Sequence, residues 1–209
     1  MLALAATGGC KGDKPVVELL DPAVVAVGAD RVLITGSVGH DQWEATATYV
    51  LVEAKNTTGK DAMITLGGEL VDAGGQPVSP LRRESLRVPA GGGRVFALVD
   101  DGKQPRPEAT DARVTVASVF HAEHPAHIVV TDGTVFDDFG RAVVGGYVVN
   151  QSNATANAVV LAAFFDEAGR PMKRPSTMFN LDPGQKRGMQ LVGPPGSRSA
   201  SLFIGEVGY

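Results

Sequence analysis

The chain repeats itself at an offset of 94 residues, the distance from Asn56 to Asn150, and this repeat limits what it can fold into. Most identical positions are turn residues, where backbone geometry restricts the choice of side chain, and the positions between them keep only their apolar or polar character. We therefore expect two copies of one small fold. The aligned pairs are Asn56 with Asn150, Ala62 with Ala156, Asp72 with Asp166, Gly75 with Gly169 and Pro77 with Pro171, and, after a one-residue deletion, Gly91 with Gly184, Arg94 with Arg187, Leu98 with Leu191 and Val99 with Val192.

Turn signals punctuate both copies. The segments Asp72–Gly75 and Asp166–Gly169 begin with Asp, whose carboxylate accepts hydrogen bonds from nearby backbone N–H groups, and end with Gly, as type I turns do. In Asp182–Gln185 the ring of Pro183 presets φ, and Gly184 can take the positive φ that a type II turn requires. Each of these turns is predicted to join two strands.

The apolar residues between the turns follow the period of strands. Val114 and Val116 alternate with polar residues, which predicts that both valines face a core. The run Val159–Phe165 is apolar on both faces, as in a central strand that is covered on each side. No window of about 11 residues or more has the 3.6-residue apolar stripe of a helix. We therefore predict an all-β protein with almost no helix.

The length of 209 residues allows one large domain or two small ones of roughly 100 to 150 residues each, and the repeat favours two. Short strands separated by turns, in two blocks, predict two tandem antiparallel immunoglobulin-like β-sandwich domains. We expect a tether over residues 1–15, a first sandwich over 16–122 and a second over 126–209. The linker is expected near residues 121–125.

The single cysteine, Cys10, cannot form an internal disulfide and follows a short run of apolar and small residues. This run, Met-Leu-Ala-Leu-Ala-Ala-Thr-Gly-Gly-Cys, resembles the end of a bacterial lipoprotein signal peptide, although it lacks a basic n-region. The resemblance implies that Cys10 is lipidated and contacts the membrane, on the outer membrane or the periplasmic face of the cell envelope. The alternative is a chance cysteine in a frayed N-terminus. No other segment reaches the roughly 18 apolar residues of a membrane span.

The second copy contains, in order, a valine-rich strand that leads to Asn150, a strand that ends in Phe164–Asp166, and the Pro183–Gly184 turn. This order resembles the FxLYD family of bacterial envelope domains, which are small immunoglobulin-like or fibronectin-like sandwiches. The first copy is looser, because its strand ends in Leu70–Asp72 without an aromatic pair. The resemblance implies a fold and a compartment, and it implies no ligand and no assigned activity.

Charge and motifs argue against several functions. The net charge is −4 and the basic residues are dispersed, so no nucleic-acid partner is expected. No serine lies in a nucleophile elbow, and the glycines 91–93 lie between predicted strands and so form no phosphate loop before a helix. We expect no cofactor and no enzyme, since two slender sandwiches should lack a deep pocket. We expect a protein-binding or scaffolding module that offers sheet edges or loops to another envelope protein or a surface polymer.

Three of the four histidines, His121, His124 and His127, lie within seven residues and suggest a metal site. In an extended linker, successive histidines would lie about 9 Å apart, which is too far for one ion with bonds near 2.1 Å. Only a sharp turn at Pro125 could gather them. The alternative function is therefore sequestration of a metal or another ligand by this segment of the envelope protein.

Overall fold

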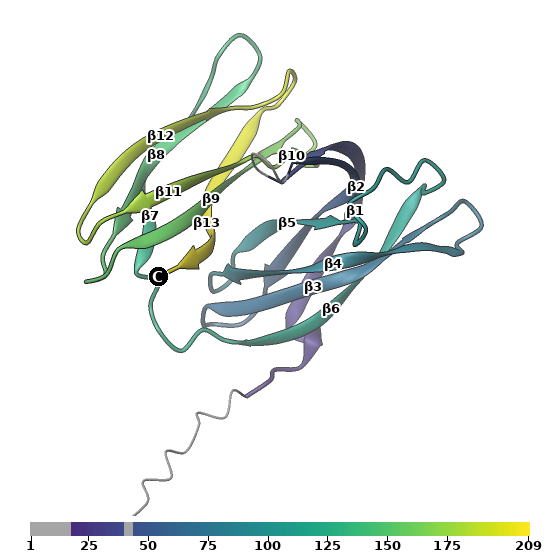
Figure 1. The fold of residues 1–209 in the computed structure, drawn as a ribbon, viewed down its shortest axis with the longest axis horizontal. Helices are drawn as coiled ribbons and strands as arrows, with labels where there is room; N and C mark the ends of the chain where they lie inside the picture. Colours follow the sequence, from purple (N-terminus) through teal and green to yellow (C-terminus); the bar gives the residue numbers. More distant parts are fainter. Residues whose placement is uncertain (1–17, 40–43) are drawn as a thin grey trace, which may run out of the picture.

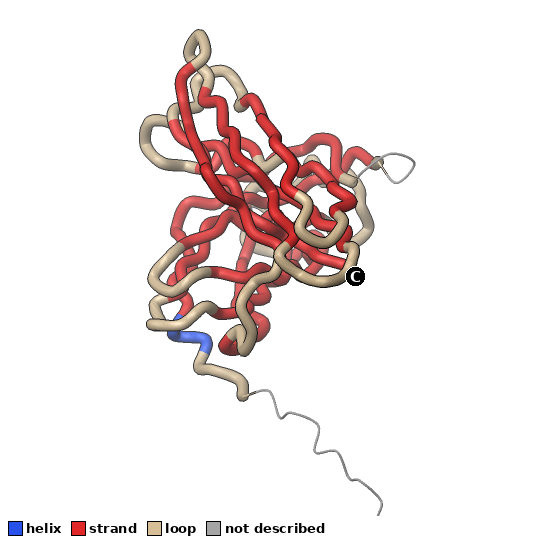
Figure 2. Tube along the Cα trace, turned by 90° about the vertical axis from the view of Figure 1, so that its left-hand side faces the viewer, coloured by secondary structure: helices blue, strands red, loops and turns tan. Residues whose placement is uncertain are grey.

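The computed structural model describes residues 18–39 and 44–209, and nearly all of their regular structure is antiparallel β-sheet (Figures 1 and 2). Within these ranges the only helix is η1 (Pro22–Val24), a single 3-10 turn. The N-cap is Asp21, whose Oδ1 accepts a hydrogen bond from the N–H of Ala23 at 2.8 Å. The prediction of an all-β protein with almost no helix is confirmed.

The first sandwich consists of two three-stranded sheets. One sheet has the order β1-β2-β5 and the other has the order β4-β3-β6. Every pairing in them is antiparallel. The strands are β1 (Val25–Val38), β2 (Ala45–Asn56), β3 (Ala62–Val71), β4 (Pro77–Val88), β5 (Gly93–Val99) and β6 (Asp111–His121).

The second sandwich follows the linker formed by residues 122–127. One of its sheets has the order β12-β8-β7, and the other is built around β9, with β10 and β11 paired along one edge and β13 along the other. The strands are β7 (Ile128–Asp137), β8 (Ala142–Asn150), β9 (Ala156–Phe165), β10 (Pro171–Lys173), β11 (Ser176–Leu181), β12 (Lys186–Val192) and β13 (Ser199–Gly208).

A buried asparagine closes the end of β2. Asn56 is fully buried, and its Nδ2 donates to the carbonyl oxygens of Lys60 and Val88 at 2.8 and 3.1 Å. Its Oδ1 accepts from both the backbone N–H and the hydroxyl of Thr58, at 3.0 and 2.8 Å. One amide side chain thus ties the loop after β2 to the end of β4, and it satisfies backbone groups that would otherwise be buried without partners.

Asn150 makes the same bonds one repeat later. Its Nδ2 donates to the carbonyl oxygens of Ala154 and Leu181 at 2.8 and 3.0 Å. Its Oδ1 accepts from the N–H and the hydroxyl of Ser152, at 2.9 and 2.7 Å. Each partner is the residue that the sequence alignment places opposite a partner of Asn56. The two halves therefore share hydrogen bonding as well as strand order.

The turns repeat as well. Asp72 and Asp166 each accept, through Oδ1, a hydrogen bond of 2.8 Å from the N–H four residues further on. The closing residues Gly75 and Gly169 have φ of 74° and 78°, a conformation that glycine adopts without strain. In the Pro183–Gly184 turn the glycine has φ of 73°. These turns set the register of the strands that they join.

Strand β9 is buried on both faces, as the apolar run in the sequence predicts (Figure 1). Ala162 and Phe164 lie in a core within the second sandwich. The alternate residues, Leu161 and Ala163, belong instead to the core cluster of the first sandwich, together with Phe203 of β13. The two sandwiches therefore share apolar contacts.

The sheet of the first sandwich that faces the second sandwich is β1-β2-β5. Val50 and Val52 of β2 are fully buried on the side that faces β4-β3-β6, and Leu51 between them points the other way and is also fully buried. Val95 of β5 lies on the same face as Leu51 and is 1% exposed. The molecule is thus a stack of four sheets in which β1-β2-β5 and the β9 sheet are the inner layers.

An ion pair crosses this interface. Nη2 of Arg174, in the loop after β10, lies 2.6 Å from Oε1 of Glu84 on β4, and the Arg174 side chain is only 7% exposed. Nη1 of Arg174 donates to the carbonyl oxygen of Val95 at 3.3 Å, and Oε2 of Glu84 accepts from the N–H of Ala97 at 2.7 Å. The pair fixes how one sandwich sits on the other.

Replacing Asn150 with Ala is expected to lower the free energy of unfolding by about 2–4 kcal/mol, because buried backbone carbonyls lose their donor and Ser152 loses its acceptor. Urea denaturation followed by circular dichroism measures this change. The control is Asn153→Ala, which alters an exposed residue of the same loop and should change stability by about 0.5 kcal/mol or less. Equal stability of the two variants would contradict the role given to Asn150.

Arg174→Ala is expected to lower the free energy of unfolding by about 2–4 kcal/mol, because it leaves the carboxylate of Glu84 in the interface without its cation. Arg170→Ala is the matched control, since the Arg170 side chain is 60% exposed, against 7% for Arg174, and its pair with Asp166 should contribute about 1 kcal/mol at most. Urea denaturation of both variants decides the matter. Losses of the same size would show that leaving Glu84 without its cation costs no more free energy of unfolding than breaking a surface pair.

Candidate functional site

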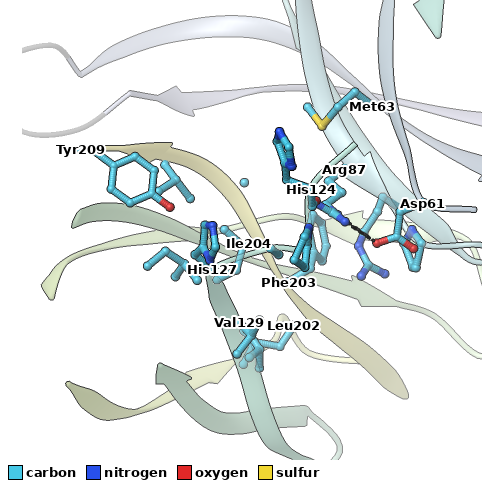
Figure 3. Close-up of a pocket in the computed structure, with 18 residues that line it drawn as sticks. Asp61, Met63, Arg87, His124, His127, Val129, Leu202, Phe203, Ile204 and Tyr209 are labelled. Atoms are coloured by element: carbon cyan, nitrogen blue, oxygen red, sulfur yellow. Dashed lines mark hydrogen bonds and ion pairs between the residues drawn. The ribbon is translucent and has the colours of Figure 1, made fainter. Parts of the chain in front are cut away.

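A hollow of about 480 Å³ lies where the two sandwiches and their linker meet (Figure 3). Its walls are residues 124–130 of the linker and β7, residues 202–205 of β13, and Met63 and Pro89 of the first sandwich. Tyr209 and His127 lie at one end, and Asp61 and Arg87 lie at the other. The hollow is open to solvent on one side, and its volume lies within the roughly 300 to 1,000 Å³ range of ligand sites, so it arises from the stacking of two sandwiches that we expect to lack a deep pocket.

The hollow follows the edges of two strands. Consecutive residues of a strand point to opposite faces, so a wall made of the four successive residues 202–205 must include the edge of β13. In the described part of the chain, β13 pairs only with β9 and β7 pairs only with β8. The edges that β13 and β7 turn away from those partners carry no strand.

The polar end of the hollow contains one carboxylate held by an arginine. Nε of Arg87 donates to Oδ2 of Asp61 at 2.9 Å, and its Nη1 donates to the carbonyl oxygen of His124 in the linker at 2.6 Å. Burial works to raise the pKa of Asp61, but the hydrogen bonds from Arg87 and from the N–H of Ala90, with the charges of Arg87 and Arg94, outweigh it and lower the pKa. Asp61 is therefore an anion whose charge is already neutralised.

Arg94 is the second cation at this end. Its guanidinium carbon lies 4.9 Å from the centre of the Phe203 ring, a cation–π contact across the two sandwiches. Nη1 donates to the carbonyl oxygen of Gly93 at 2.9 Å, whereas Nε is buried without a hydrogen-bond partner. Burial lowers the pKa of Arg94, and the negative charge of Asp61 opposes this effect. Two guanidinium groups thus share one carboxylate.

The walls of the hollow are mostly apolar. None of the lining residues is Ser, Thr, Cys or Lys, and the reactive side chains among them are Asp61, His124, His127 and Tyr209. The side chains of residues 128–130 and 202–204 are apolar. An arrangement of this kind can hold an apolar group while the guanidinium groups orient a polar one.

The three histidines divide between two hollows. His124 and His127 line the hollow described above, and His121, at the end of β6, lines a neighbouring one of about 260 Å³ together with Glu123 and His124. Nδ1 of His121 is buried without a hydrogen-bond partner. Within residues 18–39 and 44–209, no group of three or more His, Cys, Asp or Glu side chains is placed to hold a metal ion.

The remaining sites expected from the sequence lie elsewhere. Cys10 and the tether over residues 1–15 fall outside the described residues. The turn residues at 72–75, 166–169 and 183–184 connect strands and are not among the residues that line either hollow. Over the described ranges, no helix is both long enough and apolar enough to cross a membrane.

Sequence reasoning did not single out Asp61, Arg87, Arg94 or Phe203 as site residues. Asp61 directly precedes β3, Arg87 lies on β4 and Arg94 on β5, all in the first sandwich, and the stacking of the sandwiches brings Phe203 of β13 to them. The repeat aligns Arg94 with Arg187, which is exposed on β12 and therefore gave no sign of a buried role. The one signal in the sequence was a single charged residue, Arg94, in the otherwise apolar strand β5.

Comparison with known proteins adds little. No protein-family model matches the chain, and no curated protein matches it. Among solved structures, red sea bream transglutaminase is similar, with a TM-score of 0.26 and 16% sequence identity. That match covers 82% of this chain and 28% of the transglutaminase chain, so this chain spans well under half of its length. This likeness is too weak to carry an argument about function.

Proposed function

We propose that this chain is a non-enzymatic binding module of the bacterial cell envelope, tethered through a lipid on Cys10, and that it engages its partner in the hollow between its sandwiches. The partner is another envelope protein, and a surface polymer is the alternative that the experiment distinguishes. The module acts by holding this partner near the membrane. The FxLYD resemblance supports the same compartment.

The observation that carries this proposal is the hollow itself. It is apolar over most of its wall, it has charged groups at one end, and the lining residues include no Ser, Thr, Cys or Lys. The shared core and the pair of Arg174 with Glu84 hold the two sandwiches that form it. A site between fixed walls binds without first having to order its own side chains, which favours affinity.

A photocrosslinking residue at Met63 tests the binding site. Met63 lines the hollow, whereas Thr65 lies two residues along the same strand, on the same face of the sheet and outside the hollow. In cells that carry the full chain, we expect an adduct from position 63 and none from position 65. Protease removes the added mass if the partner is a protein and leaves it if the partner is a polymer. Equal adducts from both positions, or none from either, would contradict the proposal.

Cys10→Ser is the matched test of the tether. We expect the wild-type chain to carry acyl groups on Cys10 by mass spectrometry and to sediment with membranes, and the variant to lose both properties. Membrane sedimentation of the variant at the wild-type level would overturn the lipid anchor.

Metal sequestration is the second candidate, because His124 and His127 line one hollow. Titration with Zn²⁺ in a calorimeter compares the wild type with a variant in which His121, His124 and His127 are all Ala. We expect the same heat from both proteins, since two histidines do not complete the four-ligand set that zinc prefers. Heat that the triple variant loses would favour the metal function.

A further inference from the structure

The hollow combines an apolar trough with an excess of positive charge at one end, and this combination identifies a class of ligand. We propose that it binds a single-chain amphiphile with an anionic head group, whose acyl chain lies along the edges of β13 and β7 and whose head group pairs with Arg94. This inference rests on the proposed function and deepens it, because the amphiphilic group is the part of the partner that enters the same hollow.

The trough supplies the apolar part of the site. Residues 202–204 and 128–130 form its walls, and Met63 and Pro89 close it from the first sandwich. An acyl chain needs no hydrogen bonds, so it can fill such a space completely. Each methylene that leaves water contributes about 0.8 kcal/mol, so each is expected to tighten binding by up to about fourfold until the hollow is full.

The charged end supplies the polar part. Of the three guanidinium nitrogens of Arg94, only Nη1 donates to the protein, and it does so to Gly93. Asp61, the one carboxylate side chain among the lining residues, already binds Arg87 at 2.9 Å. Nε is covered by the protein, so the contact that Arg94 can offer a carboxylate or phosphate in the hollow is a charge-assisted hydrogen bond from Nη2.

Charge also decides against the other amphiphiles. The lining side chains carry two guanidinium groups and one carboxylate. A cationic head group at this end would be repelled by Arg94 and would find no unpaired carboxylate to bind. A neutral head group would accept from Nη2 of Arg94 without supplying a counter-charge, and such a hydrogen bond is weaker than one to an anion.

The test uses the full chain and four probes with the same twelve-carbon tail: dodecanoate, dodecyl phosphate, dodecanol and dodecyltrimethylammonium. Calorimetry below the micelle concentration should show both anions binding at least about tenfold more tightly than the cation and the alcohol. The ratio of dodecanoate to dodecyl phosphate indicates which head group the site prefers. Equal binding of the anions and the cation would overturn the proposal.

Arg94→Gln should weaken dodecanoate binding by about 10-fold to 100-fold, with little change for dodecanol. Its matched control is Arg187→Gln, which alters the equivalent arginine of the repeat on the exposed strand β12 and should bind dodecanoate as the wild type does. Val129→Trp, which fills the trough, should abolish binding of all four probes. If Arg94→Gln does not fold, an unchanged affinity of Val129→Trp still overturns the proposal.

The two proposals can fail separately. If Met63 gives a specific adduct in cells but dodecanoate does not bind, the ligand class is wrong and the binding module stands. If dodecanoate binds through Arg94 while Cys10→Ser still sediments with membranes and Met63 gives no adduct, the ligand class stands and the envelope function is wrong.

Discussion

The structure depends on the burial of the second face of β9. Leu161 and Ala163 cannot be covered by the second sandwich's own sheet, and they are buried against the first sandwich instead. Burying a leucine or a phenylalanine contributes about 1.5 to 3 kcal/mol each, so Leu161, Phe203 and Leu51 together outweigh what an ion pair adds. The pair of Arg174 with Glu84 contributes little net energy once its desolvation is counted, and its role is to fix the relative position of the sheets.

That apolar contact has a consequence at the rim of the interface. Where the sandwiches meet the linker, the edges of β13 and β7 remain uncovered and enclose the hollow. Arg94 is drawn into the same place, because its aliphatic stem belongs to an inner sheet and its guanidinium packs on Phe203 of the other sandwich. The packing of the two sandwiches thus leaves the guanidinium of Arg94 without a complete set of hydrogen-bond partners. Charged groups of this kind often mark binding sites.

The repeat shows how one local design can serve two roles. Asn56 and Asn150 make matching bonds, because each must satisfy the same buried backbone groups at the end of a strand. Arg94 and Arg187 occupy equivalent positions, yet Arg187 is exposed, whereas the guanidinium of Arg94 packs on the Phe203 ring of the other sandwich. The local geometry is therefore copied, whereas the environment of each copy depends on what the other sandwich brings to it.

The sequence by itself determined the strands, the turns and the duplication, because these follow from side-chain alternation and from the few residues that tolerate positive φ. It also predicted that β9 is covered on both sides, since the run Val159–Phe165 is apolar at every position. Only the tertiary structure decided what covers it. With that, it also decided the hollow, the incomplete pairing of Arg94 and the placing of His121 and His127 in different hollows. The physical reason is that periodicity reports how many faces of a strand are buried, whereas contacts between distant segments depend on how whole sheets stack.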